Sequence, residues 1–325
     1  MDSQLVAVTS QCGVFGTFAF YLLICLRSEN RKGVALIGGV LFAVIFEHLN
    51  VVRFANVRGG YSYHPASWFQ IAGDTPLYVP LAWGYILATS RTLTDRLRLK
   101  FWARPFCDAL LTLVIDASLD VVAIRLHFWS WRGIGRREGF FGVPADNFLG
   151  WLLVSLSYST LIRGLDSPYF ARAPMKIAQI SPRVRTALNL AYHWLLLPPI
   201  AFALYLGLEK SVGLCYRLFH ADTLQQQLLV LLAYLVIFIA VVALGATRDR
   251  DRDQLVIPPE TIRETSEFAL ATDLTRLSFH LFGMFGLLYL TVVGARPEWE
   301  LWLVSGAAWG LERGAGVFAR QRTKV

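Results

Sequence analysis

Apolar runs about as long as a bilayer is thick recur along the whole chain. A helix needs about 20 mostly apolar residues to cross a bilayer, and few of these runs contain a charge. We expect spans near residues 5–26, 33–50, 76–90, 107–124, 146–162, 187–207, 224–244 and 277–294. A shorter run at 299–311 indicates a ninth span or an interfacial helix. The pattern predicts an all-α, polytopic transmembrane helix bundle with about 8–9 spans, forming a single integral-membrane domain over residues 1–325.

Lysine and arginine residues between the runs predict the orientation. Loops after odd-numbered spans carry 18 of them, and loops after even-numbered spans carry 8. Because basic loops favour the cytoplasm, we expect a multi-pass protein of the cell (inner) membrane with its N-terminus outside. Basic residues follow the first run and do not precede it, which is not typical of a cleavable signal. We expect residues 245–276 to form a cytoplasmic loop. Thr261 and Glu264 have the spacing of a capping box, which predicts the start of a short helix within it.

Composition supports the membrane class. The chain is 55% hydrophobic and has a formal net charge of +8. In a soluble protein this charge would suggest nucleic acid, but here the basic residues gather in loops, where they meet anionic lipid headgroups. We therefore expect these basic residues to contact the lipid bilayer and not nucleic acid. The sequence leaves the oligomeric state unknown.

Two carboxylates in the fourth expected span are the first candidates for chemistry. An acidic residue near the centre of a spanning helix costs ~2.5–3.5 kcal/mol on insertion scales, so it indicates function. Asp116 and Asp120 are four residues apart and share one helix face. Two like charges in a low dielectric do not ionise together easily, so we expect an acid beside a base. The alternatives are an ion pair with Arg125 or a helix–helix hydrogen bond.

A second cluster closes the second expected span. Glu47 and Asn50 are three residues apart, follow a long apolar run and share a helix face. Both could instead be the ordinary interfacial end of a helix. The loop at 51–75 follows directly and contains Tyr61 and Tyr63. A loop of this length and composition is typical of a lid.

A third cluster joins spans four and five. This segment, FWSWRGIGRREGFFGVPADN, is rich in aromatic residues and glycines, and contains Trp129, Trp131 and Phe141. Asp146 and Asn147 then open span five, where Asp146 could be a helix N-cap. The tryptophans also fit the ordinary interfacial belt of a membrane protein.

The expected topology brings the three clusters to one membrane face. The ends of spans two and four and the starts of spans three and five lie on the same side, whichever orientation is right. We therefore expect carboxylates, amides and aromatics to share one cavity there. The six histidines show no H-x-x-H or H-x-x-x-H spacing, which argues against a His-rich di-iron site, so we expect no bound metal.

Several of these segments together resemble a known family. FEHLNV at 46–51, PLYVPLAWGYI at 76–86, DASLD at 116–120 and FFGVPADNFLGW at 140–151 follow in that order. The order is similar to the membrane-bound carotenoid biosynthesis proteins that include the carotenoid hydratases, of the bisanhydrobacterioruberin hydratase and γ-carotene 1′-hydroxylating hydratase type. The resemblance is strongest over residues 40–160. One departure is Val121, where the family pattern would place a proline.

The resemblance implies a reaction and a set of residue roles. Water would add across a terminal double bond of an acyclic carotenoid or related isoprenoid lipid, without a redox cofactor. Asp116 or Asp120 would be the acid, and Glu47 or Asp146 would position the water. The residues expected to contact the substrate are Asn50, Tyr61, Tyr63, Trp129, Trp131, Phe141 and Asn147.

Two other functions stay open from the sequence. An intramembrane prenyltransferase could use the same carboxylates to bind Mg²⁺ and a diphosphate, although the second acidic stretch, Asp249 to Asp253, falls on the opposite membrane face. A transporter or isoprenoid-binding protein would also carry polar residues inside its spans. No inverted repeat or matched pair of broken helices supports the transporter.

Overall fold

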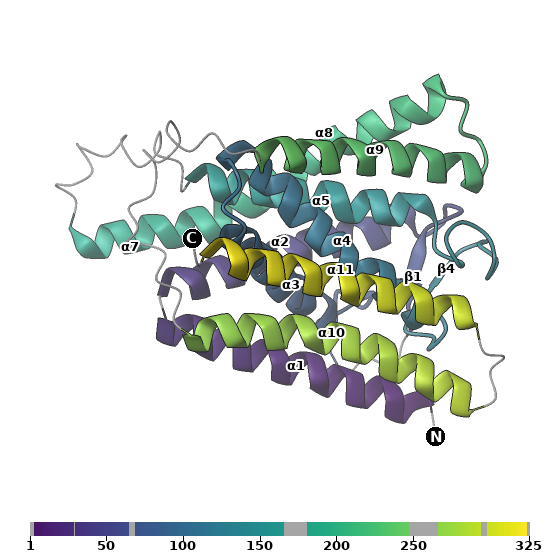
Figure 1. Cartoon of the computed structure of the whole chain (residues 1–325), viewed down its shortest axis with the longest axis horizontal. Coiled ribbons are helices and arrows are strands. Elements are labelled where there is room, and N and C mark those ends of the chain that lie inside the picture. Colours follow the sequence, from purple (N-terminus) through teal and green to yellow (C-terminus); the bar gives the residue numbers. More distant parts are fainter. Residues whose placement is uncertain are drawn as a thin grey trace.

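The computed structural model describes residues 3–28, 30–64, 69–165, 181–246, 266–293 and 298–323. Long helices lie roughly side by side in one bundle, with short strands at one end (Figure 1). The helices are α1 (Ser3–Ser28), α2 (Asn30–Phe54), α3 (Tyr78–Arg96), α4 (Arg104–Ala123), α5 (Ala145–Leu165), α7 (Pro182–Ala191), α8 (Leu197–Leu218), α9 (Leu224–Gly245), α10 (Ser266–Val292) and α11 (Trp299–Thr323). The predicted all-α bundle is confirmed.

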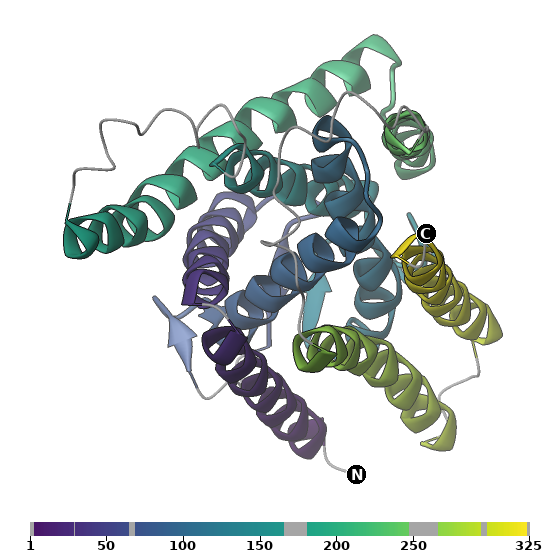
Figure 2. The same cartoon turned by 60° about the vertical axis from the view of Figure 1, so that its left-hand side comes forward.

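Among the described residues, four stretches are long and apolar enough to cross a membrane by length and composition: Val6–Ser28, Lys32–Phe54, Thr186–Leu218 and Leu224–Gly245. On α9, large apolar side chains such as Leu232, Val236 and Ile239 remain exposed, as expected for a helix that faces lipid. In contrast, α4 is enclosed and packs against α3, α5, α9, α10 and α11 (Figure 2). The helix that carries the expected acids is thus near the centre of the bundle.

Several element boundaries differ from those expected. Residues 266–276 are the first turns of α10 and not part of a loop, while the expected capping box lies outside the described residues. The short run at 299–311 belongs to the 25-residue helix α11.

A π-helical turn, Tyr192–Leu196, joins α7 to α8. The turn ends two residues before Pro198, and Pro198 and Pro199 have no N–H to donate to an α-helical ladder.

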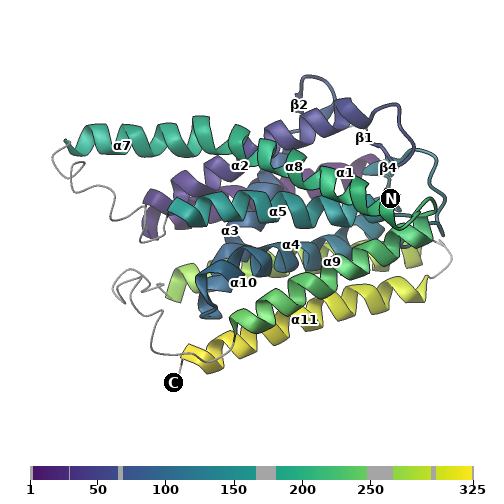
Figure 3. The ribbon, with the colours of Figure 1, turned by 90° about the horizontal axis from the view of Figure 1, so that it is seen from above.

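Short strands at one end of the bundle were not anticipated. β1 (Tyr61–Tyr63) pairs antiparallel with β4 (Trp129–Trp131), and β2 (Gln70–Ile71) pairs with β3 (Thr75–Pro76). The pairing of β1 with β4 connects the segment after α2 to the segment after α4 (Figure 3). We call this two-stranded element the aromatic ribbon.

Buried ionic groups elsewhere in the bundle satisfy one another. At the end of the bundle away from the ribbon, Arg163 donates two hydrogen bonds to Asp108, with Nε–Oδ2 at 2.6 Å and Nη2–Oδ1 at 2.8 Å. Between α10 and α11, Arg276 Nε lies 2.7 Å from Glu312 Oε1, and His280 Nε2 lies 2.9 Å from Glu312 Oε2. Charges inside a membrane domain need such partners.

Candidate active site

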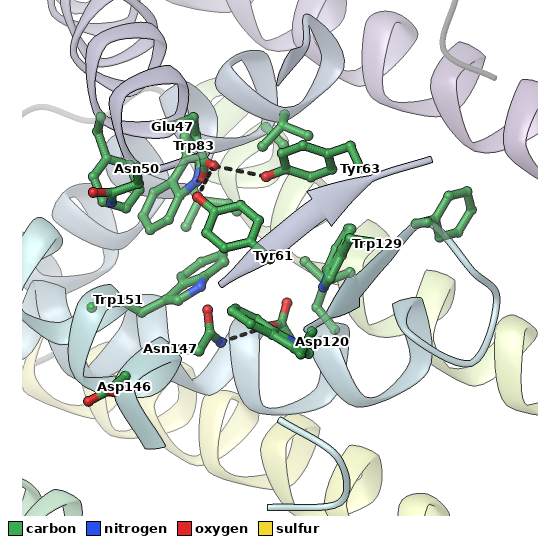
Figure 4. A pocket seen from close by; sticks show the side chains of 18 of the residues that line it. Glu47, Asn50, Tyr61, Tyr63, Trp83, Asp120, Trp129, Asp146, Asn147 and Trp151 are labelled. Carbon is green, nitrogen blue, oxygen red and sulfur yellow. Dashed lines mark hydrogen bonds between the residues drawn. The ribbon is translucent and has the colours of Figure 1, made fainter. Parts of the chain in front are cut away.

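A cavity of about 1010 Å³ lies inside the bundle, next to the aromatic ribbon (Figure 4). Its walls come from α1, α2, α3, α4, α5, α8 and α10 and from both strands of the ribbon. Most of the lining is apolar, and a few polar side chains converge on it, as in typical small-molecule sites. The segments that the topology placed at one membrane face therefore do share one cavity.

Glu47 forms the first polar centre of this cavity. Its side chain is 4% exposed, and its oxygens accept three hydrogen bonds. Tyr61 Oη and Tyr63 Oη donate to Oε2 at 2.7 and 2.8 Å, and Trp83 Nε1 donates to Oε1 at 2.5 Å. Three donors with no competing acceptor suit an ionised carboxylate.

The two phenols beside Glu47 are held in their protonated form. Burial, followed by the neighbouring Glu47 carboxylate, raises the pKa of both Tyr61 and Tyr63 well above the usual range. Desolvation and a nearby negative charge both oppose phenolate formation. Tyr61 and Tyr63 are therefore hydrogen-bond donors to Glu47 at neutral pH.

Asp116, Asp120 and Asn147 form the second polar centre. Asn147 Nδ2 donates to Asp120 Oδ2 at 2.5 Å and to Asp116 Oδ2 at 3.0 Å, so one amide connects both carboxyls. Asp120 lines the cavity, whereas Asp116 is fully buried behind its wall. Asp116 Oδ1 has no hydrogen-bond partner in the described part of the chain.

Arg125 does not pair with these aspartates. It forms an ion pair with Glu298 and donates from Nη1 to the carbonyl oxygens of Val121 at 2.8 Å and of Phe141 at 2.9 Å. The ion-pair alternative for Asp116 and Asp120 is therefore not seen. Arg125 instead fixes the loop that precedes α5.

That loop depends on a tight turn at residues 139–142. Gly139 has φ +59° and Gly142 has φ +87°, a region that L side chains rarely adopt. A Cβ on Gly139 would lie 2.4 Å from the carbonyl oxygen of Val143. The turn also places Phe141 outside the cavity wall, packed edge-on against Phe140 with ring centroids 5.0 Å apart. It leads directly into α5, which carries Asn147 to the aspartates.

The aromatic ribbon forms another wall. Its register pairs Tyr61 with Trp131 and Tyr63 with Trp129, with ring centroids 5.1 and 6.0 Å apart. Alternate residues of a strand point to the same face, so all four rings face the cavity and the intervening serines stay exposed. Trp131 Nε1 is buried with no hydrogen-bond partner among the described residues. These tryptophans line the cavity, an arrangement distinct from a lipid-facing belt.

Sequence reasoning missed several lining residues. Trp83 stacks on Trp151 at 4.0 Å between ring centroids, and both line the cavity (Figure 4). Both lie within the segments quoted for the family resemblance, so the signal was present as tryptophans inside expected spans. Tyr205 and Tyr216 come from α8 and carried no such signal. Tyr216 Oη donates to Asp146 Oδ1 at 2.5 Å.

Asn50 and Asp146 also reach the cavity. Asn50 is buried, and its Oδ1 has no hydrogen-bond partner within the described ranges. Asp146 lies near the side formed by α8, where Arg53 Nη1 and Glu209 Oε2 form an ion pair at 2.6 Å. This side of the cavity is a polar mouth, and the opposite side is apolar.

Comparison with known proteins identifies the class. The chain matches the model of a family described as carotenoid biosynthesis protein over residues 9–219. It belongs to this family. The match extends beyond residues 40–160 and includes all of α8, with Tyr205 and Tyr216. No curated protein and no solved structure matches the chain.

Proposed function

We propose that this protein adds water to a terminal carbon–carbon double bond of an acyclic carotenoid or a related isoprenoid. The observation that carries the proposal is the content of the cavity. A large, mostly apolar space contains a pair of carboxyls joined by an amide and, separately, a carboxylate held by three donors. Membership of a carotenoid biosynthesis family supports the substrate class.

The first step is protonation of the alkene. Asp116 and Asp120 share one amide donor, and no lysine or arginine in the described structure forms a salt bridge with them. Burial and like charge favour one proton held by the pair. Asp120 is the acid that contacts the substrate, because it lines the cavity, and Asp116 supports it from behind. The proton bonds to the CH carbon of a terminal isopropylidene group.

The π electrons of the double bond form the new C–H bond and leave a tertiary cation. The faces of tryptophan and tyrosine rings attract cations. Trp129, Trp131 and Tyr61 lie on the cavity wall contributed by the ribbon. They stabilise the cation and exclude other nucleophiles until water adds.

Water then forms the C–O bond. Glu47 accepts the proton that the attacking water loses, and Asn50 Oδ1, which has no partner in the described structure, orients that water. We favour Glu47 over Asp146 because Asp146 lies at the polar mouth, on the side of the ion pair between Arg53 and Glu209. Returning the proton from Glu47 to the aspartate pair completes the cycle. One water is consumed, and no electrons enter or leave.

Product analysis tests this proposal. The protein is expressed in a bacterial host that makes lycopene, and the pigments are separated and weighed by mass spectrometry. We expect products heavier by one or two waters. Asp120→Asn should reduce them ~10²–10⁴-fold, the usual contribution of a general acid. Asp222→Asn, at an exposed aspartate outside the cavity, is the matched control.

The other outcomes are also informative. Unchanged lycopene with normal protein levels would refute carotenoid hydration. A product lengthened by an isoprenoid unit, formed only with magnesium, would indicate a prenyltransferase. Pigment that co-purifies unchanged would indicate a binding protein. Full turnover by Asp116→Asn and Asp120→Asn would refute the assigned acid.

A further inference from the structure

The cavity has an arm between α1 and α10, lined by small, hydroxyl and aromatic side chains. These helices pack against each other, run antiparallel and lie side by side (Figure 1). Residues on facing sides of both helices line the arm, among them Gly13 and Thr17 from α1 and Ser278 and Phe282 from α10. The mechanism above uses none of these side chains.

A second cavity continues this arm. Its volume is about 300 Å³, and Gly16, Thr17, Phe20, Leu274, Thr275 and Ser278 line it. Thr17 and Ser278 line both cavities, so the two are neighbours along the same seam. From Val6 to Phe20 the seam follows about 21 Å of helix, at 1.5 Å per residue.

The far end of the seam opens towards lipid. Phe20 and Leu274 flank the second cavity and are 43% and 47% exposed. In a membrane, such exposed apolar side chains face acyl chains. The polar mouth, with Arg53 and Glu209, lies beside α8. The ribbon of α8 lies across the bundle from α1 and α10 (Figure 2). A long hydrocarbon tail that leaves the polar centres along the seam therefore reaches exposed apolar side chains, whereas the α8 side presents an ion pair.

Small residues keep the seam open. A Cβ built on Gly13 or Gly16 would meet no atom within 4 Å. In contrast, a Cβ on Gly84, where α3 crosses α2, would lie 2.5 Å from Val40 Cγ2. The glycines in the seam are therefore not required for helix contact, and their lack of side chains leaves space for a ligand.

We propose that the seam between α1 and α10 is the channel for the hydrocarbon tail of the substrate and sets the tail length that the enzyme accepts. This inference rests on the proposed function, because it assumes that the reacting end lies between Glu47 and Asp120. The unpartnered, buried Oδ1 of Asn50 and the polar centres mark the reacting end. The tail then follows the seam towards the bilayer.

Substitutions that fill the channel test this inference. Gly16→Leu places a side chain in the second cavity, and Gly13→Leu places one nearer the acid. Gly207→Leu is the matched control, because Gly207 is a helical glycine in α8 with open space around it and lies outside both cavities. The probes are lycopene and its shorter homologue diapolycopene, which has the same isopropylidene ends.

Binding and turnover are measured separately. Purified protein in lipid nanodiscs is titrated with each polyene, and quenching of tryptophan fluorescence reports binding. We expect Gly16→Leu to weaken lycopene binding roughly ten-fold or more, while diapolycopene binding changes less than about three-fold. Gly13→Leu should weaken both, and Gly207→Leu should weaken neither.

The two proposals fail in different ways. If Gly16→Leu affected both polyenes equally, or neither, the channel assignment would be wrong even with hydration intact. If the wild-type protein bound both polyenes with the expected length dependence but added no water, the hydration proposal would fail and the channel would stand.

Discussion

Glu47 receives its three hydrogen bonds from two different elements, so its position depends on side chains far apart in the sequence. Tyr61 and Tyr63 come from β1, and Trp83 comes from the second turn of α3. The sequence indicated Glu47 because a carboxylate after a long apolar run is conspicuous, and the family resemblance implied Tyr61 and Tyr63 in the loop that follows. It did not predict the hydrogen bond from Trp83 to Glu47, because a contact between two helices has no local pattern in the sequence.

Tyr63→Phe should remove one donor and leave the ring in place. A hydrogen bond to a charged group contributes about 1.5–3 kcal/mol, and we expect a loss of that size in the free energy of unfolding in detergent. The raised pKa of Tyr63 means that stability is present at neutral pH and falls as pH rises past about 10, where unfolded phenols ionise. As the pH rises past that value, the free energy of unfolding of Tyr63→Phe should therefore fall less than that of the wild-type protein. An identical alkaline profile would contradict this.

Gly139→Ala should destabilise the turn before α5. Its φ is positive, and the new Cβ would meet the Val143 carbonyl oxygen. We expect a cost of about 1–3 kcal/mol, measured by thermal unfolding, and a loss of activity as Asn147 moves. Gly164→Ala, in open space within α5, is the control and should be neutral or stabilising. Equal effects of both substitutions would exclude the turn as the cause.

At the scale of elements, helices were predictable and the ribbon was not. Long apolar runs identify helices without any knowledge of the fold. The ribbon has two strands of three residues, and Ser62 and Ser130 are 68 positions apart in the chain. The local signal was the alternation Tyr–Ser–Tyr and Trp–Ser–Trp, which has the period of a strand. It is too short to predict pairing by itself.

A disulfide across the ribbon would test its register. Ser62 and Ser130 are paired, exposed, and have their hydroxyl oxygens 3.4 Å apart. Under mild oxidation, Ser62→Cys with Ser130→Cys should form a disulfide, detected by peptide mass mapping. The pair Ser62→Cys with Arg132→Cys, shifted by two residues from the observed register, should form little. Efficient crosslinking of the shifted pair would show that the register is wrong.

At the scale of the whole molecule, the peripheral helices are fixed by buried charge. Arg276 on α10 binds Glu312 on α11 and also donates to Ser90 Oγ on α3 at 2.7 Å and to the Leu111 carbonyl oxygen on α4 at 2.8 Å. None of this was predictable, because Arg276 fell in an expected loop. Glu312 lay beyond the last predicted run.

Glu312→Gln should leave Arg276 buried without its counter-charge. Breaking one partner of a buried ion pair usually costs about 3–5 kcal/mol, and we expect a loss of that order in the free energy of unfolding. Glu267→Gln, at an exposed position of α10, is the control and should change stability little. Equal stability of the two variants would show that the pair contributes no net stabilisation.

Orientation is a separate prediction for the whole molecule. The charge asymmetry of the loops predicts an outside N-terminus, and with it an outward-facing ribbon. A cysteine introduced at Ser62 should therefore react with a membrane-impermeant thiol reagent in intact spheroplasts. Labelling only after lysis would reverse the assigned topology.

The ribbon also has a consequence for how the protein is made. In the chain, α3 and α4 separate its two strands. During synthesis, β1 therefore has no strand partner until both helices and β4 have been made. Asn147 follows still later, at the start of α5. Closing such a long loop carries an entropic cost and slows folding. The proposed acid therefore meets its amide partner and its aromatic walls only after residue 147 has been synthesised, so a shorter nascent chain lacks the assembled second polar centre.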